Sequence, residues 1–299
     1  MSDPLITVII PTRNRAHLLA RSMGSVLNQT YRHIELIIVD DASTDGTQEL
    51  LGNIEDDRLR VLRLETNNGA PAARNHGMAH AQGELVAFQD SDDIWHPTKL
   101  ERQVTAMASA SDRVGLCVCS MEVHRRGGSH RVQWDDVELD SAGARRHIVT
   151  GAGLSTQCWL ARRDALEEAG GFDETLPRMQ DYEYSLRITE RWHLLMMNDV
   201  LVTAELQPDS ISASADRYAQ AIEQIVTRHS DLFAQYPGGH SHMIFRAGKV
   251  LAMEGRYREA VSWFRRALAI RPTNLTALVG MVLCITGLFP LFRKIKYRH

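Results

Sequence analysis

Three carboxylates stand within four positions in residues 86–95, VAFQDSDDIW. A mostly apolar stretch precedes Asp90, Asp92 and Asp93. Trp95 follows them, and we expect it either to line a ligand pocket or to belong to the core. Crowding of like charges is unfavourable unless a cation or a proton lies among them. Mg²⁺ and Mn²⁺ usually combine one or two carboxylates with substrate phosphates. The spacing therefore suits a divalent-metal site, and the alternative is an exposed acidic turn screened by water.

A second acidic pair, Asp40 and Asp41, ends another apolar run. A helix capped by Ser43 or Thr44 would account for the residues after the pair, but not for the pair itself. A carboxylate at the end of a strand can accept hydrogen bonds from a nucleobase or a ribose, as in dinucleotide-binding folds. The glycine fingerprint GxGxxG is missing from this turn of the sequence, which counts against a nicotinamide enzyme.

Arg74 lies near the start of a predicted helix, a few residues after Asn68. One interpretation is a surface salt bridge. The other is a guanidinium that meets a base or a diphosphate at the mouth of the sheet, because its fork of donors matches such groups.

Alternating strands and helices are predicted to position these side chains over the first ninety residues. Buried strands are expected at 5–10, 34–39, 60–64 and 84–88, with a helical stripe over 18–27 and helices at 44–54 and 70–81 between them. Short connections between alternating elements are typical of a parallel, doubly wound sheet. Ligands of such sheets bind beyond the carboxyl ends of the strands. Residues 11–13, 40–43 and 90–93 follow three of these ends.

The middle of the chain continues with further elements and one region without a clear pattern. We expect helices at 99–110, 163–169 and 180–191, strands at 114–121, 156–161, 194–197 and 200–205, and a variable loop over 122–150. Acceptor contacts are expected at 122–155, where no motif is evident.

From about residue 214 onward the pattern is helical. Residues 244–272 fit one tetratricopeptide-like unit, with small or large side chains at the required positions. A single unit cannot bury its own face. It must therefore pack on the first domain, on the segment that follows, or on another chain, which includes a homo-oligomer.

The tail at 275–299 combines an apolar stretch with a basic end. Residues 275–292 are apolar on nearly every face, and Arg293, Lys294, Lys296 and Arg298 follow. A spanning helix needs about 20 apolar residues, so this stretch is short. We expect either peripheral attachment to an anionic membrane or a helix that packs on the tetratricopeptide-like pair.

Composition bounds the class of protein. A chain of 299 residues with 44% hydrophobic residues can form one large domain, or one domain plus a smaller one. A net charge of −3 gives no reason to expect nucleic acid as a partner. The four cysteines lack zinc spacing, which predicts free core thiols in a reducing, cytoplasmic compartment. A strand begins within five residues, so no signal peptide is expected.

Taken together and in order, these motifs make the chain similar to the family 2 glycosyltransferases, which are inverting enzymes of the GT-A fold. The similarity covers about residues 4–212. The matching stretches are VIIPTRNR at 8–15, IVDDASTDGT at 38–47, NG at 68–69, ARNHG at 73–77, GE at 83–84, FQDSDD at 88–93, Pro97 with Lys99 and Leu100, GGFDE at 170–174 and QDYE at 180–183.

The resemblance implies a role for each candidate residue. Asp181 would be the general base; at the start of a helix, its alternative is a favourable charge–dipole arrangement. Asp92, with Asp90 or Asp93, would hold Mn²⁺ or Mg²⁺ on the donor diphosphate. The nucleotide-diphosphate sugar donor would contact Pro11, Thr12, Arg13, Asp40, Asp41, Asn68, Arg74, Asp90 and Ser91. Two positions depart from the family pattern, since Gln180 and Gln207 stand where relatives more often carry Glu and His.

The resemblance also implies the fold and the reaction. The expected fold class is α/β, with a GT-A domain (a Rossmann-like mixed sheet) at 1–213 and a small all-α region at 214–299. The expected reaction transfers a sugar to a hydroxyl of a carbohydrate or lipid-linked acceptor, in polysaccharide or glycolipid assembly, in the cytoplasm or at the inner face of the cell membrane. The alternatives are an interaction protein with a vestigial site and a nucleotidyltransferase.

Overall fold

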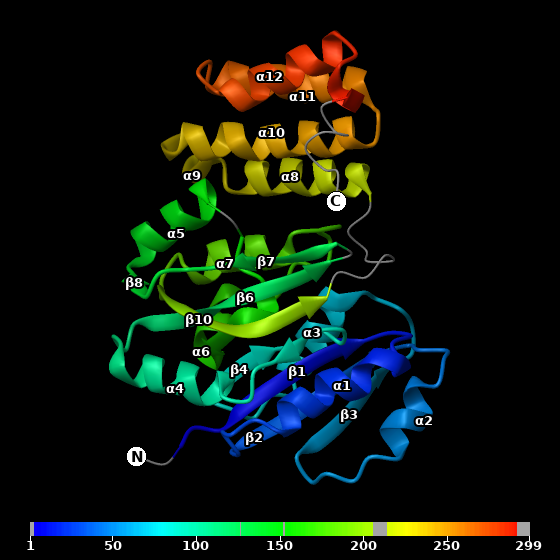
Figure 1. The fold of residues 1–299 in the computed structure, drawn as a ribbon. Helices are drawn as coiled ribbons and strands as arrows, with labels where there is room; N and C mark the ends of the chain where they lie inside the picture. Colours follow the sequence, from blue (N-terminus) through cyan, green and yellow to red (C-terminus); the bar gives the residue numbers. More distant parts are fainter. Residues whose placement is uncertain (1–2, 126, 152, 206–213, 292–299) are drawn as a thin grey trace. The chain divides into compact units, whose positions relative to one another are not determined.

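The computed structural model describes residues 3–125, 127–151, 153–205 and 214–291 (Figure 1). The chain divides into two compact units. The sheet unit comprises Met1–Arg145, Leu154–Glu174 and Tyr184–Gln207, and the helical unit comprises Arg146–Gly153, Thr175–Glu183 and Pro208–His299. The boundary predicted at residues 213 and 214 stays a prediction, because residues 206–213 lie outside the described part.

The described part of the sheet unit contains a ten-stranded mixed sheet. Its strands are β1 (Ile6–Thr12), β2 (Ile34–Asp41), β3 (Leu59–Leu64), β4 (Leu85–Phe88), β5 (Ile94–Trp95), β6 (Val114–Arg125), β7 (Gly128–Val132), β8 (Val137–Leu139), β9 (Trp159–Arg162) and β10 (His193–Glu205). The order is β3-β2-β1-β4-β9-β6-β10-β5, with β7 beside β6 and β8 beside β10. The predicted α/β mixed-sheet fold is therefore confirmed.

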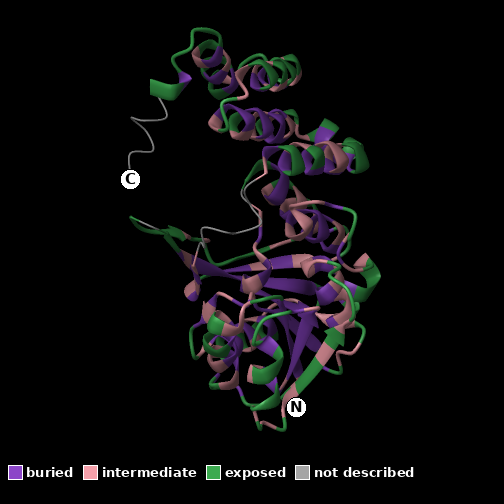
Figure 2. Ribbon diagram, turned by 90° about the vertical axis from the view of Figure 1, so that its right-hand side faces the viewer, coloured by how far each residue is buried: buried purple, intermediate pink, exposed green. Residues whose placement is uncertain are grey.

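The first four strands form the parallel half of this sheet. β1 pairs with β2 and β4, and β2 pairs with β3, all in parallel. Every residue of β1 and of β4 is buried, as the continuous apolar runs predicted (Figure 2). Their carboxyl ends consequently meet along one edge.

The second half of the sheet differs from the prediction in three places. The region 122–150, predicted as a loop, continues β6 to Arg125 and contains β7, β8 and all of α5. β7 is largely exposed, so its polar residues gave no alternating apolar signal. The strands predicted at 194–197 and 200–205 are one strand, β10, with register shifts after Met197 and Val200. The strand predicted from residue 156 begins with a short 3₁₀ helix, η1 (Thr156–Cys158).

Helices flank the strands, and all of them except α5 lie close to the predicted positions. They are α1 (Ala16–Leu27), α2 (Thr47–Gly52), α3 (Ala70–Met78), α4 (Lys99–Ser109), α5 (Ser141–Thr150), α6 (Arg163–Ala169) and α7 (Gln180–Ile188). α6 ends at Gly170 in the left-handed conformation, as its Gly-Gly pair predicted. The predicted capping of α2 by Ser43 or Thr44 is wrong, because this helix starts at Thr47, whose backbone N–H donates to Asp45.

The predicted all-helical region is confirmed by α8 (Ala215–Arg228), α9 (Ser230–Gln235), α10 (Pro237–Met253), α11 (Tyr257–Ile270) and α12 (Leu275–Ile285). The pair α10–α11 occupies the predicted tetratricopeptide-like segment. A Cβ at Gly248 would lie 2.7 Å from the Phe264 ring, and one at Gly280 of α12 would lie 3.0 Å from it. The two glycines therefore let α10 and α12 approach the buried Phe264 ring of α11. Helix α12, the segment after the pair, covers part of the face of the pair.

Two further expectations concern individual side chains. All four cysteines are free and buried, as predicted. Trp95 is 2% exposed and donates its indole N–H to the carbonyl of Gln157, so it belongs to the core.

Among the described helices, none combines the length and apolar character needed to cross a bilayer.

Candidate donor and catalytic site

The carboxyl edge of β1, β2 and β4 gathers most of the predicted donor residues. Thr12 pairs in register with Asp40, and Ile9 of β1 pairs with Phe88, two residues before Asp90. Pro11 and Thr12 are buried at the end of β1, whereas Arg13 is exposed. Parallel register alone therefore places three polar turns side by side.

Asp41 organises the loop that leads into α3. Its two carboxylate oxygens accept hydrogen bonds from the backbone N–H groups of Asn68 and Gly69, each at 2.8 Å. Asp41 is only 4% exposed. Asp41, predicted as a nucleotide contact, therefore has a structural role as well, because it fixes the backbone of Asn68 and Gly69.

Asp40 and Thr12 each leave a polar atom without a partner in the described part of the chain. One oxygen of Asp40 accepts from the backbone N–H of Ser43 at 2.9 Å. Within the described residues, its other oxygen and the hydroxyl of Thr12 are buried with no hydrogen-bond partner. Such atoms are costly unless something satisfies them, so this corner is suited to a ligand that donates and accepts.

Arg74 lies on α3 and reaches the acidic turn after β4. Its guanidinium lies 2.5 Å from a carboxylate oxygen of Asp90, and its central carbon lies 5.5 Å from the centroid of the Phe172 ring. The side chain is nearly buried, at 9% exposure. The surface salt-bridge interpretation is wrong, because Arg74 is held between a carboxylate and an aromatic face.

The acidic turn itself is tightly held. The backbone N–H of Asp93 donates to the carbonyl of Asp90, and the hydroxyl of Ser22 donates to the same carbonyl at 2.8 Å. The Asp93 carboxylate accepts from the backbone N–H of Glu205 at 3.1 Å. Burial, and then the charges of Asp90 and Asp92, hold the pKa of Asp93 well above its usual value. Ser91 is also buried, whereas Asp92 is partly exposed.

These carboxylates are not arranged as a complete metal cage. In the described part of the chain, no group of three His, Cys, Asp or Glu side chains is placed to hold a metal ion. One carboxylate oxygen of Asp90 is paired with Arg74, and the Asp93 carboxylate accepts from the backbone N–H of Glu205. A divalent ion that draws its remaining ligands from phosphates and water needs only one or two carboxylates. The donor set of Asp92 and Asp90 fits that requirement.

Backbone strain marks two of these turns. Ala42, directly after Asp41, has a φ of 55°, and Met179, two residues before Asp181, has a φ of 61°. The left-handed region costs a residue other than glycine of order 1 kcal/mol, and such strain concentrates at functional sites.

Asp181 lies in the first turn of α7, within the helical unit. Its carboxylate accepts from the backbone N–H of Tyr182 at 2.8 Å. Two residues on, Glu183 is fully buried, with Arg228 at 3.0 Å and His229 at 3.3 Å from one of its oxygens. The first turn of α7 therefore carries two carboxylates in different environments, one partly exposed and one fully buried.

Several residues of the site had no assigned role in the sequence. Phe172 packs against the Arg74 guanidinium, and Asn75 holds the Phe172 backbone through both its amide oxygen and its amide nitrogen. Both positions belong to matching stretches, but their roles depend on contacts between residues about 100 positions apart, which no local pattern contains.

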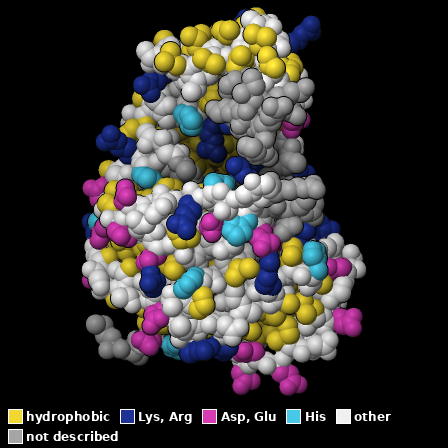
Figure 3. Space-filling model, viewed as in Figure 1, with side chains coloured by type: hydrophobic (Ala, Val, Ile, Leu, Met, Phe, Trp, Pro, Cys, Tyr) yellow, Lys and Arg dark blue, Asp and Glu magenta, His cyan; other side chains and the backbone are white. Residues whose placement is uncertain are grey.

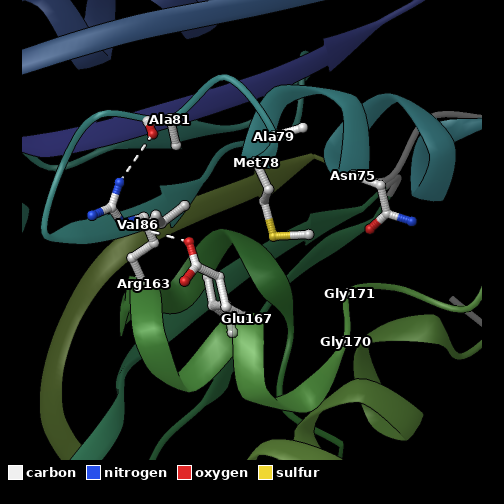
Figure 4. Close-up of a pocket in the computed structure, with 10 residues that line it drawn as sticks. Asn75, Met78, Ala79, Ala81, Val86, Arg163, Glu167, Gly170 and Gly171 are labelled. Atoms are coloured by element: carbon white, nitrogen blue, oxygen red, sulfur yellow. Dashed lines mark hydrogen bonds and ion pairs between the residues drawn. The ribbon is translucent and has the colours of Figure 1, made fainter.

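A cleft of about 510 Å³ opens on another side of α3 (Figure 4). It lies between α3 and α6, and its polar rim includes Arg163 and Glu167, which are 3.7 Å apart. None of the predicted donor, metal or catalytic residues lines it. The cleft therefore shares Asn75 with the candidate site but none of the predicted ligand-binding residues.

Comparison with known sequences gives relatives that are named glycosyltransferases. The chain is 47% identical over 110 residues to TuaG of Bacillus subtilis (strain 168), named for teichuronic acid biosynthesis; the match covers 36% of this chain and 44% of that protein. It is 42% identical over 107 residues to the UDP-Glc:alpha-D-GlcNAc-diphosphoundecaprenol beta-1,3-glucosyltransferase WfgD of Escherichia coli, covering 36% and 42%. The chain spans less than half the length of these relatives.

Solved structures share the fold over nearly the whole chain. S. aureus TarS 1–349 in complex with UDP superposes with a TM-score of 0.69 at 20% identity, covering 97% of this chain and 92% of that one. The mannosyltransferase PcManGT of Pyrobaculum calidifontis, in complex with GDP-Man and Mn²⁺, gives 0.62 at 19% identity, covering 100% and 89%.

The model of one family matches more than half of the sequence, over residues 7–170, and that span holds every candidate donor and metal residue. The chain belongs to glycosyl transferase family 2.

Proposed function

We propose that this protein is a metal-dependent, inverting glycosyltransferase that moves a sugar from a nucleotide-diphosphate sugar to a hydroxyl acceptor. The observation that carries the proposal is the edge of β1, β2 and β4, where Arg74 is held toward Asp90 and where buried oxygens of Thr12 and Asp40 have no hydrogen-bond partner among the described residues. Because the chain belongs to family 2, a sugar nucleotide is the ligand that we propose for this edge of the sheet.

The donor's nucleotide would occupy the turns after β1 and β2. The unpartnered oxygen of Asp40 can accept from a base N–H or a ribose hydroxyl, and the Thr12 hydroxyl can donate or accept. Arg74 would meet the diphosphate, because a guanidinium binds phosphate through paired donors. Pro11, Arg13, Asn68 and Ser91 would line the same edge.

Asp92, with Asp90, would hold Mn²⁺ or Mg²⁺. The bound ion would neutralise the charge that develops on the departing diphosphate. Asp93 would shape the turn, because its buried carboxyl favours the protonated form and accepts from the backbone of Glu205.

Asp181 would be the general base. The acceptor hydroxyl oxygen forms a bond to the anomeric carbon as the bond from that carbon to the diphosphate oxygen breaks, and the hydroxyl proton passes to the Asp181 carboxylate. A single displacement from the opposite face inverts the anomeric centre and requires no enzyme nucleophile.

The names of relatives suggest the range of substrates. TarS was solved with UDP-GlcNAc and PcManGT with GDP-Man, while the name of WfgD specifies a diphosphoundecaprenol acceptor. We propose a UDP- or GDP-linked sugar as donor and a cell-envelope polysaccharide or lipid-linked glycan as acceptor.

A peripheral membrane location would suit such an acceptor. The outward residues of α12 are apolar, including Leu275 at 70% and Ile285 at 62% exposure, and Figure 3 shows hydrophobic side chains gathered over this end of the helical unit. The sequence holds no Asp or Glu at 260–299 but seven Lys and Arg residues. A second copy would bring the same positive charge, so an anionic lipid surface is the better partner.

The membrane proposal is tested by vesicle sedimentation. The full chain should sediment with phosphatidylglycerol vesicles and much less with phosphatidylcholine vesicles. Replacing Val279, Val282 and Ile285 by Ser should abolish sedimentation, whereas Val61→Ser, which changes an exposed apolar residue on β3, should not. Sedimentation unchanged by the triple substitution would refute the role of α12.

The central proposal is tested by calorimetry with UDP and GDP in the presence and absence of Mn²⁺. One nucleotide should bind, and Mn²⁺ should tighten its binding at least tenfold in the wild type. Asp92→Ala should remove the metal effect, while Asp57→Ala, which removes an exposed carboxylate, should retain it. A metal effect that survives in Asp92→Ala would defeat the metal assignment, and no nucleotide binding at all would defeat the proposed function.

A further inference from the structure

We infer that Asn75 is a positioning residue of the donor site, which holds the Phe172 ring against Arg74 and thereby fixes the guanidinium that would bind the donor diphosphate. The inference rests on the proposed function, because it gives a further residue of the same site a role in donor binding. Asn75 itself would touch no ligand. Its effect would pass to the donor through two other side chains, Phe172 and Arg74.

The amide of Asn75 joins α3 to the turn after α6 by three hydrogen bonds. Its oxygen accepts from the backbone N–H of Phe172 at 2.8 Å, and its nitrogen donates to the carbonyl of the same residue at 2.9 Å and to the Glu174 carboxylate at 2.8 Å. The side chain points from α3 toward Gly171 in this turn (Figure 4). One side chain therefore holds both backbone polar groups of a residue 97 positions away in the sequence.

Gly171 is the residue that lets Asn75 approach this closely. Its φ of 81° lies in the left-handed region, which favours glycine. A Cβ at this position would lie 2.9 Å from the amide oxygen of Asn75, closer than a side chain allows. The carbonyl of Gly171 also accepts from the Arg187 guanidinium at 2.6 Å. The turn is thus fixed from α7 as well as from α3, which leaves Phe172 one position.

The ring of Phe172 contacts both sides of the ion pair that Arg74 forms. It is only 3% exposed, and its centroid lies 5.5 Å from the central carbon of the Arg74 guanidinium. It also meets Phe88 of β4 edge to face, with the centroids 5.3 Å apart. Phe88 lies two residues before Asp90 in the chain. The ring therefore links the arginine of α3 to the strand that leads into the acidic turn.

Arg74 needs this support because its polar contacts hold only part of the guanidinium. One terminal nitrogen pairs with Asp90 at 2.5 Å, whereas Nε is buried with no hydrogen-bond partner among the described residues. A long side chain loses conformational freedom when it binds an anion, and this cost falls if neighbouring groups fix the side chain beforehand. A cation over an aromatic face is attracted to it. The Phe172 ring would therefore lower the cost of binding phosphate groups.

The effect of Asn75 on Arg74 has to pass through Phe172. The two residues are consecutive in α3, and consecutive residues of a helix do not face each other. All three hydrogen bonds of the Asn75 amide go to the turn after α6. This order gives a specific expectation, namely that removing the Arg74 guanidinium should also remove the influence of Asn75 on the donor.

A double-mutant cycle on the full chain tests the inference. Calorimetry with UDP or GDP, whichever binds, is carried out in Mn²⁺ on the wild type, Asn75→Ala, Arg74→Gln and the double variant. Asn75→Ala should weaken nucleotide binding by at least about fivefold in the wild-type background and by less than about twofold in the Arg74→Gln background. Coupling of this kind is what such a cycle measures for residues that act through one another.

Phe172→Leu is the second variant, because it keeps a buried apolar side chain but removes the aromatic face. It should weaken nucleotide binding by at least about threefold, and it carries the test if Asn75→Ala fails to fold. Asn28→Ala is the matched control, since it removes an exposed asparagine whose amide donates to the carbonyl of Gly24. Its affinity should equal that of the wild type. Melting temperatures identify any variant that does not fold.

Two results would overturn the inference alone. An equal loss of affinity on replacing Asn75 in both backgrounds would mean that this residue does not act through Arg74. Unchanged affinity in folded Asn75→Ala or Phe172→Leu would mean that Arg74 needs no such support. A wild type that binds neither UDP nor GDP would instead refute the proposed function, and the inference would fall with it.

Discussion

Arg74 holds Asp90 by an ion pair of 2.5 Å, although Arg74 lies on α3 and Asp90 lies in the turn after β4. Arg74→Gln should weaken donor binding by about ten- to a hundredfold, because a hydrogen bond to a charged group contributes about 1.5–3 kcal/mol. Calorimetry with the nucleoside diphosphate measures the effect. Arg163→Gln, which removes a partly exposed ion pair with Glu167, should bind the nucleotide normally. Equal affinity in both variants would exclude Arg74 from the donor site.

Asp41 should stabilise the loop before α3 through its two hydrogen bonds to the backbone of that loop. Asp41→Ala leaves the backbone N–H groups of Asn68 and Gly69 without their acceptors. The free energy of unfolding should fall by about 1–3 kcal/mol, measured by urea denaturation. Asp57→Ala should change it by less than about 0.5 kcal/mol. A loss of nucleotide affinity without loss of stability would show instead that Asp41 acts only on the ligand.

Glu183 should stabilise the helical unit without taking part in the reaction. Glu183→Gln leaves Arg228 and His229 without their buried carboxylate and should lower the free energy of unfolding by about 1–3 kcal/mol. The control is Glu190→Gln, since Glu190 forms an exposed ion pair with Arg145 that contributes about 0.5 kcal/mol or less. Similar stability of the two variants would argue against a structural role for the buried pair.

Asp181→Asn should separate binding from transfer. The substitution keeps the side-chain oxygen that caps the backbone N–H of Tyr182 but removes the basic carboxylate. Affinity for nucleotide and metal should remain within twofold, while sugar transfer should fall by 10²–10⁴-fold, the usual contribution of a general base. If transfer survived at more than a tenth of the wild-type rate, the base would have to be sought elsewhere.

The sequence predicted best those features that depend on neighbouring residues. The unbroken apolar runs of β1 and β4 identified buried parallel strands, and parallel pairing is sufficient to bring Thr12 and Asp40 into register. The small residues at Gly248 and Ala260 identified the helix pair around Phe264 in the same way.

Features that depend on distant contacts were missed. β7 has no buried face, so its polar sequence resembled a loop until pairing with β6 defined it. Neither Ser43 nor Thr44 caps α2, because the helix starts at Thr47, whose backbone N–H donates to Asp45, while the Ser43 hydroxyl accepts from the distant backbone N–H of Asn14. The partners of Glu183 are 45 and 46 residues away, and only the folded chain reveals them.

Helix α7 belongs to both units: its first turn, with Asp181 and Glu183, groups with the helical unit, and Tyr184–Ile188 groups with the sheet unit. A chain cut near residue 213 would retain Asp181 but lose Arg228 and His229. The carboxylate of Glu183 would then be exposed without these two partners. The helices after residue 213 therefore complete the surroundings of the first turn of α7, and a shortened chain should keep both α8 and His229.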